Sequence, residues 1–264
     1  MMKTLSRITS KSVLAISFMT LASLVLAPVS GYALDTTTKT SAVSPKTSSF
    51  CAELPNKLSA TTARVTGLTD KVNQASTQQD QKMIAEYQKV DQDVANGRQK
   101  ADTKRVTDFN KLEAKANTDA KKQAIAPYEV AVRNAVNLRR AAYDAARKAY
   151  RSGAQAAVTS HHTIVTAQLN TFQGSVNAAF STATTSCAAT ANQGPTIHTA
   201  LQTSLKSARE TFRSSRKADT TVGSQIKQLA VTRQAAFKSA DQIFKTSLTT
   251  ARQALKQAFD KSSI

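Results

Sequence analysis

The sequence contains no tryptophan, little glycine or proline, and only two cysteines among its 264 residues. Aromatic residues make up 5% of the chain, so a large globular core is not expected and each helix must bury mostly small side chains. The Gly, Asn and Asp clusters that punctuate β-hairpins are missing, whereas the abundant Ala, Gln, Lys and Arg are good helix formers. We therefore expect an all-α protein, an elongated antiparallel bundle or coiled coil of about three long helices.

Signatures of catalysis and of metal binding are also missing. The sequence has no Gly-rich phosphate loop, no Gly-x-Ser-x-Gly and no His-Glu-x-x-His. His161 and His162 are adjacent, so on a helix they point about 100° apart and cannot chelate one metal together, even with His198. No helix-turn-helix, zinc-finger or RNA-binding motif is present. We expect no enzyme activity, cofactor, metal or small-molecule substrate, and an enzyme with an unrecognised site is the least favoured alternative.

Residues 1–33 have the features of a secretory signal peptide. Three basic residues precede an apolar run from Val13 to Ala27, and Gly31-Tyr32-Ala33 fits a small-x-small cleavage site. The run contains hydroxyl residues and is shorter than the roughly 20 apolar residues that a membrane-spanning helix needs. We therefore expect cleavage near Ala33 and a secreted, periplasmic or cell-surface location, with an uncleaved anchor as the alternative.

Acidic residues are scarce relative to basic ones. Cleavage of the signal would remove three of the 36 Lys and Arg residues and none of the 17 Asp and Glu residues, so the mature chain would carry a net charge of +16. Such an excess keeps a chain soluble and attracts polyanions. The alternative is a solvated charged surface without any ligand.

The remaining chain divides into a tether and a helical domain. Residues 34–50 contain nine Ser or Thr and a proline, which predicts a disordered tether. Apolar residues recur at helical spacing over 51–264, and we expect helices over about 52–120, 127–190 and 196–262. Pro127 is typical of a helix opening, and Asn192-Gln193-Gly194-Pro195 of a loop. Weak points are expected at Gly97, Gly153 and Gly223.

The last predicted helix has the most regular apolar pattern. Two rows of apolar residues step by 11 positions, one formed by Ile226, Phe237, Leu248 and Phe259 and the other by Phe244 and Leu255. A step of 11 residues is close to the helical period, so this helix should be nearly straight. A continuous helix over 196–262 would be about 100 Å long, which predicts a rod-like protein.

Cys51 and Cys187 are the only cysteines. An even number of cysteines in an exported chain favours a disulfide. Cys51 precedes the first predicted helix and Cys187 lies near the end of the second, so an antiparallel pair of long helices would bring them together. No Cys-x-x-Cys motif or neighbouring basic residue indicates a reactive thiol.

Basic residues cluster in two places with helical spacing. The clusters consist of Arg139, Arg140, Arg147, Lys148 and Arg151, and of Lys206, Arg209, Arg213, Arg216 and Lys217. Tyr143 and Tyr150 interleave with the first cluster, and their place in the apolar stripe favours a core position over base stacking. Ser152 to Gly194 contains no charged residue, so this segment is either covered by other helices or by a second copy of the chain, or is a polar surface.

These patterns lead to one functional expectation and one rival. We expect an exported, non-enzymatic structural or binding protein whose basic faces contact anionic polymers of the cell envelope or exterior: cell-wall polymers, lipid headgroups or nucleic acid. The rival is a holdase-type chaperone of an exported compartment. A homo-oligomer is compatible with either.

Overall fold

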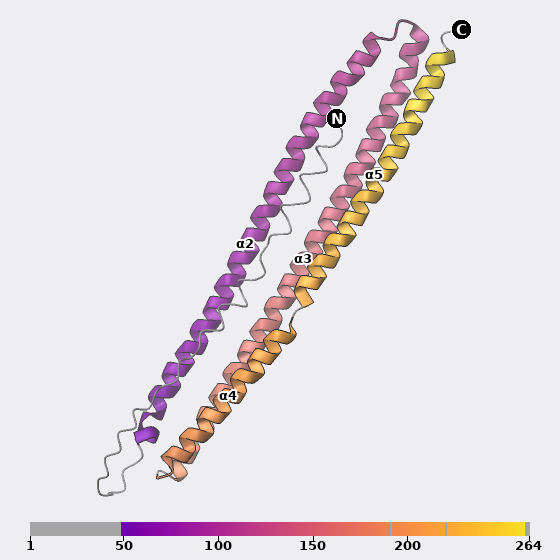
Figure 1. Cartoon of the computed structure of the whole chain (residues 1–264). Coiled ribbons are helices and arrows are strands. Elements are labelled where there is room, and N and C mark those ends of the chain that lie inside the picture. Colours follow the sequence, from indigo (N-terminus) through magenta and orange to yellow (C-terminus); the bar gives the residue numbers. More distant parts are fainter. Residues whose placement is uncertain (1–48, 191, 220, 262–264) are drawn as a thin grey trace, which may run out of the picture. The chain divides into compact units, whose positions relative to one another are not determined.

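The computed structural model describes residues 49–190, 192–219 and 221–261, and every regular element in these ranges is an α-helix (Figure 1). The elements are α2 (Ser49–Ala114), α3 (Asp119–Ala189), α4 (Gly194–Ala218) and α5 (Thr221–Lys261). The all-α prediction is confirmed. The predicted signal peptide and residues 34–48 of the predicted tether lie outside the described residues. Ser49 and Phe50, which we had assigned to the tether, form the start of α2.

The connection between α2 and α3 is not where the proline predicted it. α2 ends at Ala114, and α3 begins at Asp119, eight residues before Pro127. The Thr118 hydroxyl accepts a hydrogen bond from the backbone N–H of Lys121 at 3.3 Å and so caps the first turn of α3. Pro127 is exposed inside α3, so its lost backbone hydrogen bond lies on the solvent side. The prediction that Pro127 opens the second helix is therefore wrong.

The third predicted helix, 196–262, is two helices in the structure. α4 ends at Ala218 because Asp219, with φ −86° and ψ 70°, departs from helical geometry. α5 begins two residues later at Thr221. Gly97, Gly153 and Gly223 all lie inside helices and do not break them. The rod-like shape stays a prediction.

Two compact units make up the described chain. Unit 1 contains residues 49–79 and 162–219, which belong to α2, α3 and α4. Its main core cluster joins residues of all three helices: Leu54, Val176, Ala179, Phe180, Ala183, Ile197 and Leu201. A smaller cluster surrounds Val165, Leu169 and Phe212, and the rings of Phe172 and Phe212 lie 5.3 Å apart.

Unit 2 contains residues 80–161 and 221–261, which belong to α2, α3 and α5. Phe109, Val132 and Leu248 form its core cluster, one residue from each helix. The ring of Phe237 stacks on Tyr143 with centroids 4.2 Å apart. The 11-residue rows of α5 therefore face the other helices of this unit, as the apolar pattern predicted.

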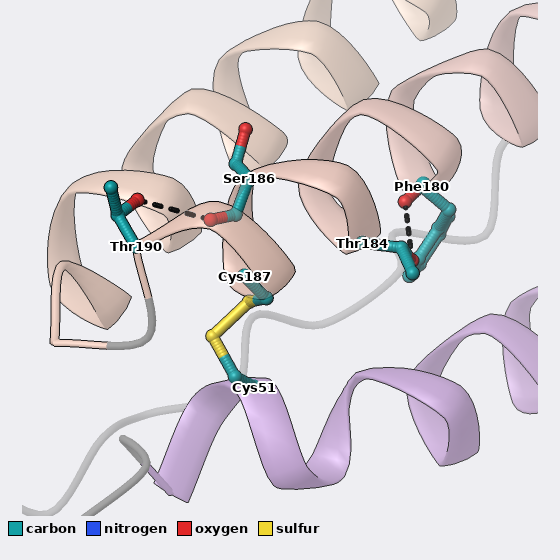
Figure 2. The surroundings of a disulfide bond; sticks show 6 residues. All are labelled: Cys51, Phe180, Thr184, Ser186, Cys187 and Thr190. Carbon is teal, nitrogen blue, oxygen red and sulfur yellow. Dashed lines mark hydrogen bonds between the residues drawn. A yellow bond between two sulfur atoms is a disulfide. The ribbon is translucent and has the colours of Figure 1, made fainter.

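The two cysteines form a disulfide in unit 1 (Figure 2). Cys51 lies in the first turn of α2 and Cys187 near the end of α3, with Cα atoms 5.7 Å apart and a sequence separation of 136. Both pack against the core cluster around Phe180. The predicted disulfide is confirmed, and it requires only that α2 and α3 be antiparallel within this unit.

The uncharged segment of α3 satisfies many of its hydroxyls within the helix. Thr184 donates to the Phe180 carbonyl at 2.9 Å and Thr190 to the Ser186 carbonyl at 3.0 Å (Figure 2). Such hydrogen bonds to the preceding turn let a Ser- and Thr-rich sequence remain helical. One face of the segment is buried in unit 1, and residues such as Thr182 remain exposed, so coverage by other helices is partial.

Candidate polyanion-binding surfaces

The arginines of the first predicted cluster form ion pairs inside unit 2. Four of the five basic side chains contact an aspartate at 2.6–2.7 Å, and three of the four pairs link α3 to another helix. The pairs are Arg139 with Asp241, Arg140 with Asp102, Arg147 with Asp144, and Arg151 with Asp91. Only Lys148 is exposed without an ion pair to a described residue. The cluster therefore joins helices, and polyanion binding by it stays a prediction.

Asp102 has the most strongly bound carboxylate of these. Arg140 donates to both of its oxygens, at 3.0 and 2.7 Å, and Arg105 donates to one of them from the same helix as Asp102. The hydrogen bonds from Arg140 and then Arg105 lower the pKa of Asp102 to about 2. The carboxylate therefore remains charged over the whole neutral and mildly acidic range.

Arg151 connects α3 to α2 through three kinds of contact. Its guanidinium donates to both oxygens of Asp91 at 2.7 Å and to the Tyr87 carbonyl at 3.2 Å, and it lies 4.7 Å from the centroid of the Tyr87 ring. The hydrogen bond from Arg151 lowers the pKa of Asp91, and burial raises the pKa of Tyr87. These groups are used in holding the helices together.

A shallow cleft of about 440 Å³ lies beside these pairs. It is lined by Asp91, Asp144, Arg147, Lys148, Arg151 and Ser152. Both carboxylates already accept hydrogen bonds from arginine, so the cleft has little charge left over for an anionic ligand.

The tyrosines near this cluster are core residues, as their spacing predicted. Tyr150 is 6% exposed, and the Arg233 guanidinium lies 4.2 Å from its ring centroid. Tyr143 stacks on Phe237. Neither ring is free to stack on a nucleic-acid base.

The second predicted cluster is more open to solvent. On α4, Lys206, Arg209, Arg213 and Lys217 are exposed, and we call these four residues the α4 ridge. At 100° per residue they lie within an arc of about 80°, roughly 110° from the buried stripe of Leu201, Ala208 and Phe212. The fifth predicted residue, Arg216, is half-buried and lies 3.9 Å from Asp219, so it is not part of the ridge.

The acidic partners of the α4 ridge are weak. Lys206 and Glu210 are 3.9 Å apart, and their side chains are 76% and 62% exposed. An exposed pair at that distance contributes little. Arg209, Arg213 and Lys217 form no ion pair with any residue in the described parts of the chain. The ridge therefore keeps nearly all of its positive charge for an external partner.

A second basic row was missed in the sequence. On α5, Lys227, Lys238, Lys245, Arg252 and Lys256 are all exposed, and we call these five residues the α5 ridge. Their steps of 11, 7, 7 and 4 residues place them within an arc of about 40°. The same 11-residue step that identified the apolar rows of α5 was available for its lysines. The wide spacing hid them, because a search for local clusters detects only neighbouring charges.

Other potential sites are poorly supported. No group of three or more His, Cys, Asp or Glu residues able to hold a metal occurs among the described residues. A hydrogen bond joins the Ser76 hydroxyl to Nδ1 of His162, so this histidine packs between α2 and α3. None of the helices in the described ranges has an apolar stretch long enough to cross a bilayer.

Comparison of the chain with models of protein families, with curated proteins and with solved structures found no match.

Proposed function

We propose that this protein is an exported, non-enzymatic helical protein that binds anionic polymers of the cell envelope or exterior through the α4 ridge. The observation that carries the proposal is the contrast between the two predicted clusters. The arginines on α3 are neutralised by aspartates of their own unit, whereas the α4 ridge has four exposed cations and one distant acidic neighbour. Charge that is not used within the fold is available to a ligand.

Export is supported by the signal-like N-terminus and by the disulfide. A disulfide between α2 and α3 is stable in an oxidising compartment and rare in the cytosol. An anionic polymer outside the cytoplasm is the partner that a basic, exported surface would meet.

Binding should depend steeply on salt. Each contact between a cation and a polyanion releases counterions, so the logarithm of affinity falls with the logarithm of salt concentration, with a slope of about 0.7 per contact for a single-stranded polyanion. Four contacts from the α4 ridge give a slope of about 2.8, so affinity should drop about 50-fold between 50 and 200 mM salt.

The test uses the disulfide-bonded protein and linear polyphosphate as the probe. The variant Arg209→Glu/Arg213→Glu should bind at least tenfold more weakly at ~50 mM salt, with helix content unchanged. The matched control is Arg64→Glu/Lys71→Glu, two exposed residues of α2 in the same unit. This control makes the same change in net charge and should bind much more tightly than the α4 variant.

Two results would overturn the proposal. If the wild-type protein binds no polyphosphate at ~50 mM salt, the positive charge serves only solubility. If both variants lose affinity equally, binding follows net charge and the α4 ridge has no special role. Suppression of client aggregation by a protein that does not bind polyphosphate would instead favour the holdase.

A further inference from the structure

The α5 ridge is an unusually uniform charged surface. Its five cations form no ion pair with any described residue. The acidic residue closest to the ridge on α5, Asp241, is bound by Arg139 at 2.6 Å on the side that packs against α3. The other acid of α5, Asp260, lies beyond the last ridge residue, Lys256. The ridge is therefore a row of one sign over most of the helix.

The outer face of α2 in the same unit differs. Lys82, Lys89 and Lys100 lie on one exposed line of that helix, but Glu86 and Asp93 lie on the same line between them. Alternating signs at this spacing stabilise a helix in water and cancel at a distance. Two basic rows of similar length thus differ in whether acidic residues interrupt them, which supplies a natural comparison.

The geometry of the ridge fits an extended, flexible ligand. Lys227 and Lys256 are 29 residues apart, which corresponds to about 44 Å along the helix axis, and the steps between cations are about 16, 10, 10 and 6 Å. A flexible charged chain can lie along this straight row and meet every cation. The phosphates of a nucleic-acid duplex wind away from a straight row within one helical turn of about 34 Å.

The surroundings of the ridge argue against recognition of bases. Proteins that bind single-stranded nucleic acid stack the bases on exposed aromatic rings. On α5, the ring of Phe237 packs on Tyr143 and the ring of Phe244 lies 4.9 Å from the Arg139 guanidinium, so both point into the unit. Charge is the only feature that the ridge offers to a ligand.

The surroundings also differ from those of a membrane-surface helix. Such a helix carries a broad apolar face beside its cations. Along the α5 ridge, the exposed residues between the cations include Gln234 and Thr249, and Val231 is the single apolar one. A polymer in solution or in a wall matrix suits this surface better than a bilayer.

We propose that the α5 ridge binds a flexible phosphodiester polymer that lacks bases, of the poly(glycerol phosphate) type, lying along the helix. This inference rests on the proposed function in that both invoke anionic polymers. It concerns a separate surface in the other unit and names the chemical class of its ligand.

The test measures affinity for poly(glycerol phosphate) as a function of salt. Five contacts predict a slope of about 3.5, or a loss of roughly 130-fold between 50 and 200 mM salt. The variant Lys238→Gln/Lys245→Gln/Arg252→Gln leaves two contacts, so its slope should be about 1.4 and its loss about sevenfold over the same range. Glutamine keeps the helix, so circular dichroism should not change.

The matched control is Lys82→Gln/Lys89→Gln/Lys100→Gln. It removes the same charge from the same unit, but from the mixed row of α2, and it should keep a slope within about 0.5 of wild type. Equal losses in the two triple variants would show that net charge alone drives binding and would overturn the ridge as a site. A wild-type slope in the α5 variant would overturn it as well.

The ligand class is tested with a thymidine oligonucleotide and a DNA duplex of matched total charge. The proposal expects the α5 variant to lose more affinity for poly(glycerol phosphate) than for either nucleic acid. A larger loss for the oligonucleotide would assign the ridge to single-stranded nucleic acid and overturn the ligand class. If Arg209→Glu/Arg213→Glu weakens polyphosphate binding while the α5 variant binds normally, the proposed function stands and this inference fails.

Discussion

Removal of the disulfide should destabilise this protein strongly. The bond joins Cys51 to Cys187 over a separation of 136 residues, and the loop it closes contains most of α2 and α3. In the chain-entropy model, closing a loop of that size restricts the unfolded chain by about 5 kcal/mol. The double variant Cys51→Ala/Cys187→Ala also loses some packing against the unit 1 core, which contributes on the order of 1 kcal/mol.

Urea unfolding measures this directly. With an m-value of about 2.5 kcal/mol/M, a loss of 5 kcal/mol lowers the midpoint by about 2 M. Wild-type protein treated with a reductant should unfold close to the double variant. Amide exchange should accelerate most in the first turns of α2, because the bond fixes this helix end to α3. A midpoint shift below about 0.4 M would refute the reasoning, since the bond would then contribute less than about 1 kcal/mol.

Two further substitutions follow from local geometry. Gly67→Ala should stabilise unit 1 by up to about 1 kcal/mol, because no atom lies within 4 Å of the added Cβ and alanine is the better helix former. Gly153→Ala should gain less or nothing, since a Cβ there would lie 2.7 Å from a Leu229 methyl carbon, and equal urea midpoints for the two variants would contradict this. Asp102→Asn should cost about 1 kcal/mol near neutral pH, a value reduced for solvent screening because the Asp102 side chain is 45% exposed. Its lowered pKa of about 2 means that the stabilisation is present above pH 4 and lost as the pH falls toward 2, so wild type and variant should converge in acid, and a constant difference from pH 7 to 2 would contradict it.

Much of the fold was predictable because it depends on composition and periodicity. Scarce glycine and proline, abundant helix formers and an 11-residue apolar step predicted α5 and the inward position of Phe237. The disulfide followed from two cysteines near matching helix ends. These features depend on local chemistry and on one simple topology, and both are readable from a single sequence.

The helix boundaries were less predictable because competing local signals had to be weighed. Pro127 is a strong signal for a helix start, but Thr118 caps the helix earlier, and an exposed proline is tolerated in the helix that follows. The end of α4 depends on the backbone of Asp219, which its sequence does not mark clearly.

The candidate site was predictable only in part, because the sequence does not tell which charges meet one another. Arg140 and Asp102 are 38 residues apart and become partners only when α2 and α3 pack together. The first cluster therefore resembled a binding face although its charge is used inside unit 2. The α5 ridge escaped notice for the opposite reason, since its lysines are far apart in sequence and align only on the helix.

The central claim is that exposed basic ridges of this protein bind anionic polymers. The most direct measurement is the affinity of the mature, disulfide-bonded protein for linear polyphosphate between 50 and 200 mM salt, alongside Arg209→Glu/Arg213→Glu. The account predicts measurable binding at 50 mM, a fall of about 50-fold across this range, and a clearly weaker variant. Absence of binding at 50 mM, or a variant with wild-type affinity, would contradict it.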